Sequence, residues 1–174
     1  VTIGSLNDDQ VVQIDQDNEG ASRDLTAILL SRQWKRIAYM GASKDLLVDE
    51  ARYSGYLRAH RDIGVEVDKS LVFREEVTEA SMRSHVDELL EKGVDCIICQ
   101  DDAVCTLVLD ELRNQGARVP EDMRVASCHN SKVLDNYPVS VTSLRFDNTE
   151  IGRTACTVLL DLLDGKPVSR KTLL

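Results

Sequence analysis

The chain has 174 residues, of which 43% are apolar and 29% are charged, while only nine are Gly and three are Pro. These values are those of a folded globular protein of one or two domains, and they exclude disordered and fibrous classes. The formal net charge of −9 has the wrong sign for a broad phosphate-binding surface, so we do not expect this chain itself to bind nucleic acid.

Short β-branched runs alternate with longer helical patterns along the chain. In chain order we expect strands at 1–4 and 11–15, a helix at 19–32, a strand at 36–40, a helix at 51–63, a strand at 71–73, a helix at 80–92, a strand at 94–99, a helix from 101 or 102 to 115, strands at 124–128 and 141–146, and a helix at 149–163. Gly93 and Gly116 directly follow helical patterns, as C-terminal stops do. The alternation predicts an α/β fold with a doubly wound parallel sheet.

Hydropathy and cysteine usage bear on the cellular compartment. No apolar run approaches the length of about 18 residues that crosses a bilayer, so we expect no membrane partner. The five cysteines are an odd number without dense spacing, which favours a reducing cytoplasm. Cys96 and Cys99 form a C-x-x-C motif within an expected strand. Residues i and i+3 of a strand point to opposite faces, so we interpret both as buried apolar side chains rather than as a metal or disulfide pair.

Polar residues follow each expected strand of the central block. Open parallel sheets bind ligands in the crevice beyond the carboxyl ends of their strands. The residues there are hydrogen-bonding and mixed in charge, which suits a ligand with many hydroxyl groups, although loops at strand ends are also polar for solvation alone. They are Ser43, Lys44 and Asp45, then Arg74 and Glu75, then Gln100, Asp101 and Asp102, and finally His129, Asn130 and Ser131.

Signatures of catalysis are missing from the sequence. The glycines form no G-x-G, the three histidines lack metal-ligand spacing, and there is no G-x-S-x-G elbow. We therefore expect no enzyme activity, no cofactor and no metal. A receiver domain is disfavoured, because Asp101-Asp102 follows the third strand of the block and no Lys follows a late strand. A sugar- or nucleotide-acting enzyme that uses Asp101 or His129 as an acid–base group remains an alternative.

The helix expected at 102–115 has more apolar surface than one buried face needs. Its apolar arc covers roughly 200°, whereas burial of one face takes about 100–140°. The excess indicates either a subunit interface or a helix wedged between the sheet and a neighbouring helix. The residues of this arc are Val104, Cys105, Leu107, Val108, Leu109 and Leu112.

Four stretches, in a fixed order over nearly the whole chain, form a family pattern. They are Asp17-Asn18-Glu19-Gly20-Ala21 with its helix into Trp34–Gly41, then Arg52-Tyr53-Ser54-Gly55-Tyr56, then Gly93–Ala103 with Gln100-Asp101-Asp102, and finally Gly116–Met123 leading into Val141–Phe146. This pattern resembles the effector-binding core of the LacI/GalR transcription regulators, which is itself similar to periplasmic sugar-binding proteins. The resemblance implies a periplasmic-binding-protein-like fold and a small sugar or sugar phosphate as the effector.

The resemblance also implies which residues would touch the effector. Arg52 matches the arginine that in this family bonds effector hydroxyls or carboxylates, although it could instead be a surface arginine paired with Asp49 or Glu50. Gln100 and Asp101 match the polar pair after the strand, which in the family is often Asn-Asp.

The chain departs from the family after the expected strand at 124–128. The family usually has Tyr-Asp-Asp or Tyr-Asp-Asn there, whereas this chain has Cys128-His129-Asn130, so His129 stands where an effector-binding Asp is expected. The departure is closer to the branch that responds to trehalose phosphate or sucrose, with Asn130 as the working polar group. Lys44, beside Asp45, would then serve a phosphorylated sugar together with Arg52, unless it is simply solvated.

The resemblance further implies the domain organisation and the partners. Residues 1–34 would belong to a partial N-terminal lobe, 35–139 to a nearly complete C-terminal lobe, 140–165 to the return into the N-terminal lobe, and 166–174 to the start of a final C-terminal-lobe segment. We expect a fragment that forms a homodimer and reaches operator DNA only through a helix-turn-helix headpiece outside the chain. A solute-binding protein of an ABC-type transporter is the alternative, which would need a signal peptide and which the cysteine usage disfavours.

Overall fold

The computed structural model describes all 174 residues and divides them into two compact units, which are described separately below. Unit 1 comprises Val1–Asn18 and Phe146–Leu174, and unit 2 comprises Glu19–Arg145. In and around unit 2 the elements are α1 (Asn18–Ser31), β3 (Ile37–Met40), α2 (Leu47–Asp62), a 3₁₀ turn (Lys69–Leu71), β4 (Val72–Phe73), α3 (Glu79–Lys92), β5 (Cys96–Cys99), α4 (Asp102–Asn114), β6 (Arg124–Ser127), α5 (Lys132–Asp135) and β7 (Thr142–Ser143). Those of unit 1 are β1 (Thr2–Ile3), β2 (Gln13–Asp15), α6 (Asn148–Leu163) and β8 (Lys171–Leu173).

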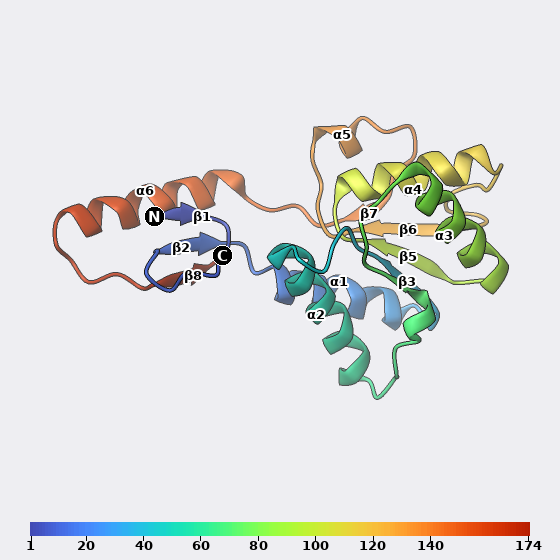
Figure 1. Ribbon diagram of the computed structural model, residues 1–174, viewed down its shortest axis with the longest axis horizontal. Helices are drawn as coiled ribbons and strands as arrows, with labels where there is room; N and C mark the ends of the chain where they lie inside the picture. Colours follow the sequence, from blue (N-terminus) through green and yellow to red (C-terminus); the bar gives the residue numbers. More distant parts are fainter. The chain divides into compact units, whose positions relative to one another are not determined.

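Unit 2 is a three-layer α/β structure around a parallel sheet with the strand order β4-β3-β5-β6-β7. Alternate residues of β3 enter different cores, because successive side chains of a strand point to opposite faces: Tyr39 packs with α1 and α2, and Met40 packs with α3 and α4. These two helix pairs lie on opposite sides of the sheet in Figure 1. The predicted α/β fold with a doubly wound parallel sheet is confirmed.

Local signals in the sequence define the ends of the helices beside the sheet. Asp101 is the N-cap of α4, and its Oδ1 accepts a hydrogen bond from the Val104 backbone N–H at 2.8 Å. Gly93 ends α3 in the left-handed conformation with φ of 60°, as its position predicted. The result is that Gln100 and Asp101 are held between the end of β5 and the start of α4.

The burial of two predicted features is now clear. Cys96 belongs to the core on the α1 and α2 side and Cys99 to the core on the α3 and α4 side, so the prediction of opposite faces for the C-x-x-C motif is confirmed. Of the apolar arc on α4, all members are buried except Leu107, which is 42% exposed. Most of that arc is therefore occupied by α3, α5 and the sheet, which favours the wedged-helix interpretation.

Unit 1 contains a three-stranded parallel sheet with the order β1-β2-β8. α6 packs on β1 and β2, and its Ile151 forms a small core with Val12 and Ile14. No helix anywhere in the structure combines the length and the apolarity needed to cross a bilayer.

The division of the structure differs from the expected lobe boundaries at three places. Leu25 and Leu29 of α1, which was expected with residues 1–34, pack in the core of unit 2, because the apolar face of the helix covers the sheet. β7, within the expected return at 140–165, pairs with β6 of unit 2. β8, within the segment 166–174, pairs with β2 of unit 1. The assignment of each unit to a lobe of a full-length protein remains a prediction.

Candidate functional site

The carboxyl ends of β3 and β5 define the point where a ligand crevice is expected. α2 follows β3 and covers one face of the sheet, while α4 follows β5 and covers the other. The two connections diverge there, which makes this the switch point of the sheet, the place where open α/β sheets bind their ligands. Gly41 and Gln100 directly follow the two strands, and the Gln100 backbone N–H donates to the Met40 carbonyl at 2.8 Å.

Arg52 reaches this point from the second turn of α2. Its side chain is buried, with the residue 5% exposed, and Nη1 donates to the Gln100 carbonyl at 2.7 Å. The Ser22 hydroxyl donates to the Arg52 carbonyl at 2.7 Å and so attaches α1 to the same turn. The alternative of a surface arginine paired with Asp49 or Glu50 is therefore wrong: Arg52 lies at the switch point, and those two carboxylates bind another arginine.

The Gln100 side chain presents an unused acceptor at the switch point. Gln100 is 2% exposed, and its Nε2 donates to Asp101 Oδ2. An ionised carboxylate only accepts hydrogen bonds, so this contact fixes which end of the amide is nitrogen. The Oε1 atom is left buried without a hydrogen-bond partner. Because a buried acceptor without a donor is costly, this atom is suited to receive a donor from a ligand.

His129 and Asn130 follow β6, the next strand of the sheet. His129 Nδ1 lies 3.0 Å from Asp102 Oδ1. Burial opposes the ionisation of Asp102, but hydrogen bonds from Ser131 and His129 outweigh it and hold the pKa of this carboxyl below its usual range. Asn130 donates from Nδ2 to Asp135 Oδ1 at 3.0 Å, and its Oδ1 is a second buried acceptor without a partner.

Lys44 and Asp45 lie apart from this group. Both are exposed on the loop after β3, where the Asp45 backbone N–H donates to Ser43 Oγ at 3.2 Å. Lys44 lines a pocket of about 450 Å³ on the β4 side of α2, whereas Arg52 points to β5. The structure thus brings Arg52 and Gln100 together and does not place Lys44 beside Arg52 as a joint phosphate site.

A buried ion pair beside the site was missed by sequence reasoning. Arg74 Nε donates to Asp49 Oδ2 at 2.7 Å, with side-chain exposures of 6% and 0%. Tyr39 donates its hydroxyl to Asp49 Oδ1 at 3.0 Å, and burial together with Asp49 raises the pKa of this phenol far above its ordinary value. No local pattern in the sequence signals this pair, because Asp49 and Arg74 are brought together by the pairing of β3 with β4.

The site is equipped for binding and shows no activated nucleophile. Burial raises the pKa of the Cys96 thiol to about 12 and that of Cys128 to about 11, so both remain neutral. No group of three or more His, Cys, Asp or Glu side chains is arranged as a metal site. The donors and acceptors at the switch point can instead hold a polar ligand in a fixed orientation.

The chain is similar to known proteins over most of its length. Residues 26–174 match the model of the periplasmic binding protein-like domain. The chain is 30% identical over 161 residues to the HTH-type transcriptional regulator CelR of Thermobifida fusca, which covers 91% of this chain and 47% of that protein. It is 27% identical over 154 residues to the HTH-type transcriptional repressor CytR of Escherichia coli K12, and this alignment covers 87% of this chain and 45% of CytR. The chain spans about half the length of these curated relatives.

Solved structures show the same similarity. A complex of the transcriptional regulator CelR with cellobiose aligns with a TM-score of 0.82 at 30% identity, over 98% of this chain and 53% of that one. The transcription regulator CcpA of Lactococcus lactis aligns with a TM-score of 0.84 at 25% identity, over 99% of this chain and 64% of the CcpA chain. All of these relatives are transcription regulators rather than enzymes.

Proposed function

Because this chain belongs to the periplasmic binding protein-like family, in the form that LacI-type transcription regulators contain, we propose that it is the effector-sensing and dimerising core of a bacterial regulator. The observation that supports this most directly is the buried Arg52 guanidinium bonded to Gln100 at the switch point of the sheet. In the full-length cytoplasmic protein, a helix-turn-helix headpiece would bind the operator. The net charge of −9 on this chain repels the phosphates of DNA, which is consistent with operator binding by the headpiece instead.

The proposed effector is a small sugar, and the site favours an unphosphorylated one. Gln100 Oε1 and Asn130 Oδ1 are buried acceptors without partners, and two carboxylates directly follow Gln100 in the chain, those of the α4 N-cap Asp101 and of the first α4 residue Asp102. Such a set attracts hydroxyl donors and repels a phosphate. The solved complex of the relative CelR contains cellobiose, a neutral sugar. A sugar phosphate is the other outcome of the test.

The proposed mechanism is a shift of populations. Effector binding would favour one of two states of the dimer, which differ in their affinity for the operator. The shift cannot exceed the difference in the effector's affinity for the two states. Whether the sugar releases or promotes operator binding depends on which state binds it better.

The test is a melting-temperature screen of the full-length protein against cellobiose, trehalose, sucrose and trehalose 6-phosphate. A ligand at 100 times its dissociation constant adds about 2.7 kcal/mol of stability, which gives a clear rise. We expect a neutral sugar to raise the melting temperature and to change the affinity for an operator fragment selected from genomic DNA. A sugar that binds without changing operator affinity would contradict the proposal of a transcription regulator. It would favour the alternative, a solute-binding protein of an ABC-type transporter.

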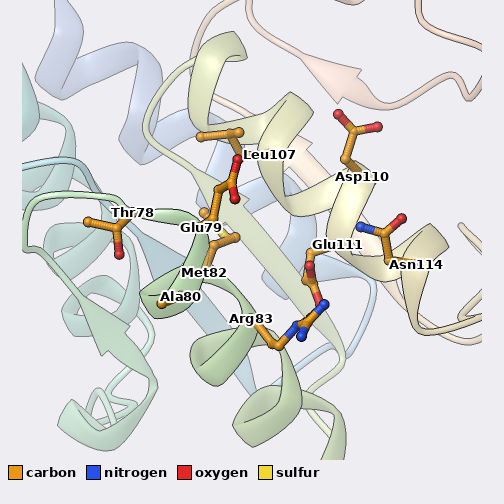
Figure 2. A pocket seen from close by; sticks show the side chains of 9 residues that line it. All are labelled: Thr78, Glu79, Ala80, Met82, Arg83, Leu107, Asp110, Glu111 and Asn114. Carbon is orange, nitrogen blue, oxygen red and sulfur yellow. Dashed lines mark ion pairs between the residues drawn. The ribbon is translucent and has the colours of Figure 1, made fainter.

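The proposed homodimer face lies on α3 and α4. A pocket of about 610 Å³ is lined by residues of these two helices. Figure 2 shows its side chains, among which Leu107 lies near Glu79. Arg83 Nε lies 3.4 Å from Glu111 Oε1 in the same pocket. A two-fold interface must be complementary to itself. The exposed Leu107, with side chains of both charges around it, meets that condition, because a second copy can bury the leucine and pair the charges.

We expect Leu107→Asp to convert the dimer to a monomer, since a buried unpaired carboxylate costs several kcal/mol at an interface. Light scattering after size-exclusion chromatography measures the mass. The matched control is Leu57→Asp, which changes a leucine of similar exposure on α2 and should leave the mass unchanged. A Leu107→Asp protein that stays dimeric would place the interface elsewhere.

A further inference from the structure

We infer that Arg74 is a positioning residue for the effector site: through the buried Asp49 carboxylate it fixes the first two turns of α2 and, with them, the Arg52 guanidinium. This inference rests on the proposed function of the site. It concerns the β4 side of α2, which sequence reasoning did not connect with Arg52.

The start of α2 has no cap of its own. Its N-cap residue is Leu46, whose side chain has no oxygen to accept from the free amide groups of the first turn, and no side chain caps the helix there. A helix that begins in this way frays unless tertiary contacts hold its first turn. Arg52 lies only one turn further along, so its position depends on those contacts.

The Asp49 carboxylate supplies the contact to the sheet. It is fully buried and accepts from the Tyr39 hydroxyl at 3.0 Å and from Arg74 Nε at 2.7 Å. The absence of a side chain at Gly41 makes room for it, because a Cβ there would lie 2.7 Å from Asp49 Oδ1. The first turn of α2 is thereby attached to the ends of both β3 and β4.

Arg74 holds three residues of α2 at once. Besides Asp49, its Nη2 donates to Glu50 Oε2 at 2.7 Å, and its guanidinium lies 4.3 Å from the centre of the Tyr53 ring. Although burial opposes the charge, the hydrogen bonds to Asp49 and Glu50 raise the pKa of Arg74. A lysine could reproduce the charge and would lose this fork of directional bonds.

The same two turns carry Arg52 toward β5. Asp49 and Arg52 are three residues apart, so they are neighbours on the helix surface. Asp49 fixes the helix to β3 and β4, and Arg52 Nη1 contacts the Gln100 carbonyl at 2.7 Å on the other side. A rotation of the first turns of α2 that loosened the contact of Asp49 with Arg74 would also displace Arg52 from the Gln100 carbonyl. Binding groups must be held to about 0.5 Å by their supporting residues, so a small displacement is enough to weaken binding.

The experiment separates positioning from stability. Single replacement of a buried ion would leave its partner unpaired, so the main variant is Asp49→Leu with Arg74→Met, which removes both charges and keeps the volume. Arg74→Lys is the second variant, which keeps the charge. The matched control is Arg58→Met, which removes an exposed α2 arginine that pairs with Glu19 at 3.3 Å. All are made in the full-length protein.

Two readouts are used: hydrogen exchange of the Arg52 Nε–H by NMR without ligand, and cellobiose affinity by calorimetry. We expect Arg52 exchange at least 10-fold faster in the double variant, a smaller increase in Arg74→Lys, and no change in Arg58→Met. Cellobiose affinity should fall at least 10-fold in the double variant, with a melting temperature near that of the unchanged protein. Unchanged Arg52 exchange in both Arg74 variants would overturn the inference. If the unchanged protein binds no sugar, the proposed function fails, while the exchange measurement still decides the inference.

Discussion

Arg52→Met is expected to lower the affinity for the effector about 100-fold and to leave the fold largely intact. The guanidinium is a charged donor in a dry environment, where hydrogen bonds to ligand hydroxyls are strongest, and a 100-fold loss corresponds to about 2.7 kcal/mol. Methionine keeps the apolar stem packed against its neighbours. Asp49 and Glu50 keep their partner Arg74, so no carboxylate of α2 is left unpaired by the change. The measurement is calorimetric titration with the sugar found in the screen.

The stability of the Arg52→Met protein must be measured alongside its affinity. Loss of the bond from Nη1 to the Gln100 carbonyl should cost about 1.5–3 kcal/mol, which lowers the melting temperature by some degrees without unfolding the protein. The control is Arg61→Met, an exposed arginine near the end of α2, which should bind the sugar normally. An Arg52→Met protein with normal affinity would show that the effector binds away from the switch point.

The pattern of strands and helices in unit 2 followed from the sequence because local signals define it. Apolar periodicity predicted the long helices, and the capping residue Asp101 and the terminal Gly93 set ends that agree within a residue or two. Three elements were missed: the 3₁₀ turn at Lys69–Leu71, α5 and β8. α5 has four residues, too few to show a period, and β8 is a strand only because it pairs with β2, far away in the chain.

The candidate site was predictable in part. The ends of expected strands placed Gln100, Asp101 and His129. The rule that parallel sheets bind ligands beyond the carboxyl ends of their strands was enough to group these residues. The pairing of Asp49 with Arg74 was not accessible in this way, because it depends on β3 and β4 being neighbours in the sheet. The different surroundings of Lys44 and Arg52 were not predictable either: both follow β3 in sequence, but Lys44 lines a pocket beside β4, whereas Arg52 bonds to Gln100 after β5.

Gly55→Ala is expected to destabilise the protein by about 3 kcal/mol or more, although alanine is the better helix former by about 1 kcal/mol. Gly55 lies inside α2, where α1 passes so closely that an added Cβ would meet the Glu19 carbonyl oxygen at 2.2 Å and the Arg23 nitrogen at 2.8 Å. Both are backbone atoms, so the two helices would have to separate. Urea unfolding followed by circular dichroism measures the loss.

The matched control for this change is Gly152→Ala in α6, where an added Cβ meets nothing within 4 Å. Only the helix propensity changes at that position, so we expect the free energy of unfolding to rise by up to about 1 kcal/mol. If both alanine variants were stabilised, the close contact of α1 with α2 would be absent in solution. The contact matters for the site as well, because Ser22 of α1 donates to the Arg52 carbonyl at 2.7 Å. Separation of the helices in the Gly55→Ala protein should therefore weaken effector binding along with the fold, whereas Gly152→Ala should leave binding unchanged.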